Sequence, residues 1–147
     1  MTLIALKTLY EQDYNLWLKT TVHLLRENKL DQIDYDNLIE ELEGMGRSDK
    51  RALKSNLEQL LMHLLKWQYQ SNKRTGSWER FIKEHRNRVL DTLEDSPSIK
   101  PYLNEIFNKC YQNARDYAVS ETGLSLATFP NICPFTIQQI LDTGFFW

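Results

Sequence analysis

The 147-residue sequence has little of several features that would point to a particular class of protein. Its two cysteines, Cys110 and Cys133, are too few for a disulfide framework, so we expect reduced thiols and a cytoplasmic protein. No apolar run approaches the ~20 residues that a membrane helix needs, and the N-terminus lacks the basic region and cleavage site of a signal peptide. Five glycines and four prolines are too few for a long disordered tail. These absences leave a folded globular protein with no membrane association.

Helical periodicity is present almost throughout, and no segment alternates long enough to predict a strand. Leucines between Leu53 and Trp67 repeat at spacings of four and three, as in a coiled-coil seam. Asp34 or Asp31 is suited to cap the helix that follows, and Gly123 is suited to end a later one. The expected apolar faces lie within residues 14–25, 38–45, 53–67, 78–93 and 103–118, and a short helix is expected over residues 134–141.

The stripe ending at Met45 and the stripe beginning at Leu53 are out of phase by one residue. Gly44 and Gly46 flank Met45, and glycine is a poor helix former. We therefore expect a kink or short break near Gly44 to Arg47.

Short connectors between long amphipathic helices favour antiparallel neighbours. The sequence thus predicts a single all-α domain over residues 1–147, an antiparallel bundle of four main helices with a short C-terminal helix. Residues 1–9 are expected to form an N-terminal extension, and residues 124–147 a C-terminal cap. The wide apolar surface around Leu60 predicts either a central helix or a dimer interface.

The formal net charge of −2 hides an uneven distribution. Residues 11–49 carry ten acids and four bases, whereas residues 66–88 carry seven bases and two acids. Opposed or separately solvated helix faces are the simplest interpretation, and a surface for nucleic acid is the alternative. The residues of this candidate basic surface are Lys66, Lys73, Arg74, Arg80, Lys83, Arg86 and Arg88.

Four polar residues fall on or beside faces that are otherwise apolar: Glu41, His63, His85 and Glu121. His85 lies near the centre of its apolar stripe, as does Glu121, while His63 flanks the leucine seam. Buried carboxylates and imidazoles need partners, so a polar network that fixes helix register is the first interpretation. A metal or acid–base site on facing helices is the alternative, although the Glu-x-x-His pairs of helical metal sites are absent.

No motif specifies a reaction. The chain has no phosphate-binding glycine loop, no Gly-x-Ser-x-Gly and no Cys-x-x-Cys. We therefore expect no cofactor and lean away from an enzyme.

Several segments together carry a resemblance to a known family. They are YEQDYNLWL, DYDNLIEELEGMGRSDKR, LLMHLLKWQYQ, GSWERFIKEHR, SPSIKPYL, ARDYAVSETGL and FPNICPFTIQQIL, in that order. The chain resembles the bacterial, mainly cyanobacterial, family called domain of unknown function 29, from about Tyr10 to the end. The resemblance implies a small, all-helical cytosolic protein and supplies no activity, cofactor or catalytic residue.

Three functions remain open on these grounds. The preferred one is a non-enzymatic interaction or regulatory protein that acts through a protein partner or a homodimer. The second is a metal-binding bundle, enzymatic or not, that uses Glu41, His63, His85 and Glu121. The third and weakest is nucleic-acid binding through residues 66–88.

Overall fold

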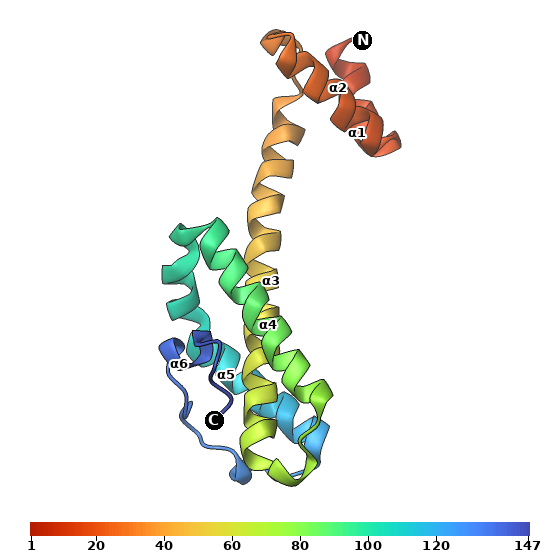
Figure 1. The fold of residues 1–147 in the computed structure, drawn as a ribbon. Helices are drawn as coiled ribbons and strands as arrows, with labels where there is room; N and C mark the ends of the chain where they lie inside the picture. The colour runs from red at the N-terminus through yellow and green to blue at the C-terminus, as the bar shows by residue number, and fades with distance from the viewer. The chain divides into compact units, whose positions relative to one another are not determined.

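A computed structural model describes all 147 residues and contains six α-helices and no strand (Figure 1). The all-α prediction is confirmed, and the short C-terminal helix is α6. Four 3₁₀ turns join the longer elements: Leu30–Gln32, Ser71–Lys73, Pro97–Ile99 and Leu126–Thr128. The helices are α1 (Leu3–Gln12), α2 (Tyr14–Arg26), α3 (Tyr35–Tyr69), α4 (Gly76–Asp95), α5 (Lys100–Thr122) and α6 (Ile137–Leu141).

The chain divides into two compact units, Met1–Ser48 and Asp49–Trp147. Residues 1–9, expected as an extension, instead form most of α1, whose first turn is capped by the Thr2 hydroxyl.

Helix α3 is continuous, so the break expected near Gly44 to Arg47 is absent. A glycine inside a helix costs only about 1 kcal/mol relative to alanine, which weakens a helix without ending it. Neither Gly44 nor Gly46 has a positive φ, unlike Gly123, which ends α5 at φ +73° as predicted. Arg47 also spans the glycine segment by pairing with Glu43 one turn earlier, at 3.8 Å.

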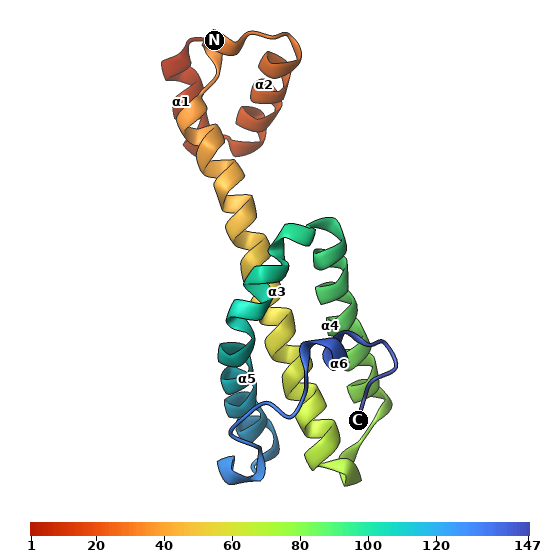
Figure 2. The same cartoon turned by 90° about the vertical axis from the view of Figure 1, so that its left-hand side faces the viewer.

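The second unit packs the C-terminal part of α3 between α4 and α5, and α4 runs antiparallel to both of the other helices (Figures 1 and 2). Leu60, Leu61, Leu64 and Leu65 are all fully buried, although they point in different directions around α3. The wide apolar surface around Leu60 therefore belongs to a central helix, which is one of the two predicted alternatives.

Two buried arginines hold the C-terminal segment against this bundle. Arg86 of α4 donates to the carbonyl oxygens of Ile140 (2.7 Å), Thr143 (3.4 Å) and Phe145. Arg115 of α5 donates from two nitrogens to backbone carbonyls of the segment that follows α5, at 3.1 and 3.0 Å. Backbone oxygens thus accept hydrogen bonds from both buried guanidinium groups.

The first unit has a much smaller core. Four apolar side chains are buried in it: Leu6, Trp17, Leu24 and Ile33. Asp34 is fully buried, accepts the indole N–H of Trp17 at 3.2 Å and caps α3 through the amide of Asn37 at 3.4 Å, so the cap predicted at this position is confirmed.

Candidate interaction groove

Exposed apolar side chains are concentrated in the first unit. Thirteen of the seventeen large apolar residues that are exposed belong to residues 1–48, whereas only four of the 23 buried apolar residues do. A third of the chain therefore carries most of its uncovered apolar surface. Such concentrations mark interaction surfaces more often than scattered single residues do.

Much of this surface forms a groove of about 410 Å³ between α2 and the first three turns of α3. On the α2 wall Leu18, Val22 and Leu25 are 36, 44 and 41% exposed. On the α3 wall Leu42 and Met45 are 59 and 64% exposed, and Leu38 is half-buried between them and the small core. The groove is lined by Tyr14, Trp17, Leu18, Thr21, Val22, Leu25, Leu38, Glu41, Leu42 and Met45.

The geometry of α2 explains why the apolar stripe of Leu18, Val22 and Leu25 stays exposed. Trp17 and Leu24 are buried, and at 100° per residue they lie on a face centred about 100° from Leu18. The apolar arc of this helix is thus wider than the arc that its neighbours cover. Our expectation that the whole stripe of residues 14–25 faces inward is wrong for Leu18, Val22 and Leu25.

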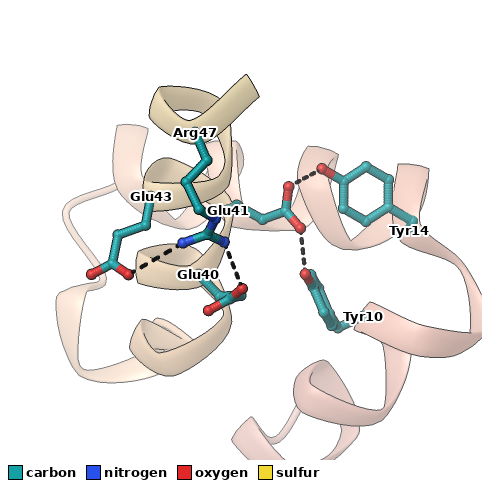
Figure 3. Close-up of polar contacts among 6 residues, drawn as sticks. All are labelled: Tyr10, Tyr14, Glu40, Glu41, Glu43 and Arg47. Atoms are coloured by element: carbon teal, nitrogen blue, oxygen red, sulfur yellow. Dashed lines mark hydrogen bonds and ion pairs between the residues drawn. The ribbon is translucent and has the colours of Figure 1, made fainter. Parts of the chain in front are cut away.

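Glu41 joins α3 to α1 and α2 beside the groove (Figure 3). Its two carboxylate oxygens accept hydrogen bonds from the hydroxyl groups of Tyr10 and Tyr14, one oxygen each. The Tyr10 ring also packs edge-on against Trp17, with ring centroids 4.8 Å apart. The hydrogen bond to Glu41 raises the pKa of Tyr10 to about 12, and the bonds from Tyr10 and Tyr14 lower the pKa of Glu41.

Replacing Glu41 by leucine should lower the pKa of Tyr10 from about 12 toward its ordinary value of 10.0, because the carboxylate that favours the protonated phenol is lost. NMR of ring-labelled tyrosines across an alkaline titration, assigned with Tyr10→Phe, measures this. Glu43→Leu on the same helix is the control and should leave Tyr10 unchanged. An unaltered Tyr10 titration in Glu41→Leu would show that the bond does not control the phenol.

Charged side chains lie on both helices outside the lining of the groove. Lys19, His23 and Arg26 are exposed on the edge of α2, and neither Lys19 nor Arg26 has an ion pair within the chain. Glu40 and Glu43 lie on α3, and Figure 3 shows both of them bonded to Arg47. Arg47 bridges this acidic pair at 3.0 and 3.8 Å, which leaves one net negative charge among the three.

The structure brings two of the four predicted polar residues together. The rings of His63 and His85 stack at 6.1 Å with 10° between their planes, and His63 also stacks on Phe81 at 5.0 Å. His85 Nδ1 lies 3.0 Å from the amide oxygen of Asn56, whose own N–H₂ donates to the Ala52 carbonyl, so Nδ1 carries the proton.

The other two have different partners. Glu41 binds the tyrosines in the first unit, and Glu121 pairs with Lys66 at 3.8 Å. Glu121 is 55% exposed, so its expected inward position is wrong. It lies in the last turn of α5, where the apolar stripe of the helix extends beyond the elements that pack against it. No three His, Cys, Asp or Glu side chains are arranged to hold a metal ion.

Two of the seven residues of the candidate basic surface are buried. Lys66 is buried with its ammonium 4.5 Å from the centre of the Trp78 ring. Arg86 is buried, with its guanidinium group bonded to the backbone carbonyl oxygens described above. Lys83 and Arg88 pair with glutamates one turn away, and Arg74 stacks on Trp67. Those three residues are exposed, as are Lys73 and Arg80, and Arg80 packs over the Phe81 ring.

Together the fold and the groove define an all-α protein whose most distinctive surface is an uncovered apolar groove. The chain belongs to the family described as Domain of unknown function DUF29, whose model matches residues 9–146. The resemblance noted from the sequence segments is therefore confirmed at the level of the family. No protein with a curated description matches the chain, and no solved structure does.

None of the six helices combines the length and the apolar composition that crossing a bilayer requires.

Proposed function

We propose that this protein is a non-enzymatic interaction protein of the cytoplasm that binds a protein partner through the groove of its first unit. The observation that carries the proposal is the concentration of exposed apolar side chains on residues 1–48. A groove between two helices, with apolar residues repeating every third or fourth position on each wall, suits the apolar face of an amphipathic helix.

The chemistry of the remaining residues supports a binding role. Burial raises the pKa of both thiols, Cys110 and Cys133, to about 11, which argues against a cysteine nucleophile. Burial also lowers the pKa of His63 and of His85. The carboxylate of Glu41 has a hydrogen-bond partner within the chain, and that of Glu121 has an ion-pair partner.

A photo-reactive amino acid at position 42 tests the proposal in cells of the organism that encodes the chain. We expect light-dependent adducts with protein from position 42, and their loss when Val22→Glu places a charge on the opposite wall. Position 132 is the control, because Ile132 is 83% exposed in the second unit and outside the groove. If position 42 gives no more adduct than position 132, the groove is not a binding surface.

A further inference from the structure

We propose that the groove binds an amphipathic helix that carries acidic side chains along one flank of its apolar seam. The inference rests on the proposed function, because it names the chemistry of the partner for the same groove. The feature that selects this chemistry is a pair of exposed bases, Lys19 and Arg26, beside the apolar wall of α2.

Both walls of the groove carry the apolar repeat of helices that pack side by side. The seam residues are Leu18, Val22 and Leu25 on α2 and Leu38, Leu42 and Met45 on α3. On each helix they are separated by four and then three residues, which is the spacing of a coiled-coil seam. A third helix in the groove can therefore pack its own seam against both walls. In such packing the positions beside the seam set the choice of partner through their charges.

Lys19 and Arg26 occupy the flank of the α2 seam. They are seven residues apart, and each directly follows a seam leucine, Leu18 or Leu25. At 100° per residue they lie about 90° from Leu18 in one direction, whereas the buried Trp17 lies about 100° from it in the other. A second hollow, of about 330 Å³, is lined by Leu18, Lys19, Val22, His23 and Arg26. The basic flank is thus continuous with the apolar wall.

The charges of these two bases are not used within the chain. Neither base has an ion pair, whereas the other bases on α-helices of the first unit, Lys7 and Arg47, both pair with carboxylates. The equivalent flank of α3 holds Ile39 and Gly46, which carry no charge. Glu41 lies on the opposite flank of α3, where two tyrosine hydroxyls occupy its oxygens. Acids on the flank that faces α2 are therefore the charge pattern that complements this groove.

A helix fits this surface better than an anionic bilayer does. Exposed charges are screened beyond about 8 Å at physiological salt, so a short helix meets mainly the charges that border the groove. A bilayer is wide and faces a whole side of the unit, and residues 1–48 as a whole carry more acids than bases. The apolar surface is also a groove between two helices, which a helix can fill and a flat surface cannot.

Selection from a random peptide library displayed on phage, against the purified full chain at low salt, tests the charge pattern. We expect the native chain to select sequences with an apolar seam and Asp or Glu at flanking positions seven residues apart. Lys19→Glu with Arg26→Glu should reverse this preference to Lys or Arg. Lys73→Glu with Arg80→Glu is the matched control, because it changes the net charge equally on exposed residues of the second unit and should keep the acidic preference.

The affinity of one selected peptide, labelled with a fluorophore, measures the effect. We expect Lys19→Glu with Arg26→Glu to bind it about tenfold more weakly than the native chain at low salt, and added salt to narrow the difference. Replacing the acids of the peptide by glutamine should remove most of this salt dependence. Leu42→Glu should abolish binding, and it should keep the fold because Leu42 is 59% exposed.

The outcomes separate this inference from the proposed function. Selected helices without an acidic flank, or an acidic preference that Lys19→Glu with Arg26→Glu leaves unchanged, overturn the inference and leave the groove as a binding surface. A library that yields no helix for the groove also overturns it, and the adducts at position 42 then decide the proposed function separately. Binding to vesicles that contain phosphatidylserine, lost in the same double variant and without selection of any peptide, would assign the basic flank to lipid and overturn the inference as well.

Discussion

Replacing Arg86 by methionine should lower the free energy of unfolding by about 3 kcal/mol or more, although methionine fills much of the same space. Arg86 is 1% exposed and serves three carbonyl oxygens, those of Ile140, Thr143 and Phe145. Methionine offers no donor, so these carbonyls lose their protein partner, and those that stay buried carry the desolvation cost of an unpaired polar group. Denaturant unfolding followed by circular dichroism measures the difference.

The loss of stability should appear first in the C-terminal segment and only then in the chain as a whole. Hydrogen bonds from Arg86 hold residues 137–147 in place. The amides of this segment should therefore exchange faster with deuterium in Arg86→Met than in the native chain. Arg88→Met is the matched control on the same helix, because Arg88 is exposed and pairs only with Glu84 one turn away. Equal stability of the two variants would contradict the role given to Arg86.

Arg86 also shows where sequence reasoning reached its limit. We placed it in a basic surface because arginine is rarely buried. The spacing did contain a signal: Arg86 follows Ile82 by four residues and precedes Val89 by three, and all three are buried. What makes burial of the charge tolerable is a set of carbonyl oxygens more than fifty residues further along the chain. Helical periodicity describes one helix at a time and cannot reveal such a partner.

The apolar stripes show the same limit of helical periodicity, here for exposed apolar residues. Periodicity correctly identified amphipathic faces in residues 14–25, 38–45 and 53–67, because the 3.6-residue repeat is a local property. It could not tell that the last stripe is enclosed between α4 and α5 while the first two line an open groove. Whether a stripe is covered depends on the number of neighbouring helices, which is a property of the whole fold.

The predicted polar residues divide in a similar way. The sequence identified His63 and His85 as polar residues near apolar faces, and the structure stacks them together. It gave no sign that Glu41 would accept from Tyr10 and Tyr14, since Tyr10 lies on a segment that we did not expect to be helical. The helix α1 was missed because it is only ten residues long and we took its apolar start for part of an extension.

Lowering the pH from 6.5 to 4 should destabilise the protein through His63 by at most about 3 kcal/mol. The side chain is 7% exposed, and burial, followed by the positive charge of Lys66, lowers the pKa of His63 to about 4. Below pH 6.5 this histidine binds a proton in the unfolded chain, while the folded chain keeps it neutral until about pH 4. Unfolding therefore takes up a proton between pH 6.5 and pH 4, and the protein becomes less stable as the pH is lowered through this window. Below pH 4 the contribution of His63 levels off.

His63→Phe isolates this contribution, because phenylalanine keeps a flat ring against Phe81 and His85 and cannot take up a proton. Unfolding free energies of the native chain and the variant are measured by denaturant at several pH values, and the native chain should lose stability relative to the variant as the pH falls from 6.5 to 4. Carboxylates add their own acid dependence to both curves, so only the difference between the curves reports on His63. His23→Gln is the control, since His23 is exposed and its replacement leaves the stack untouched. Two curves that stay parallel across this window would mean that the stacked imidazole is protonated as readily in the folded chain as in the unfolded one.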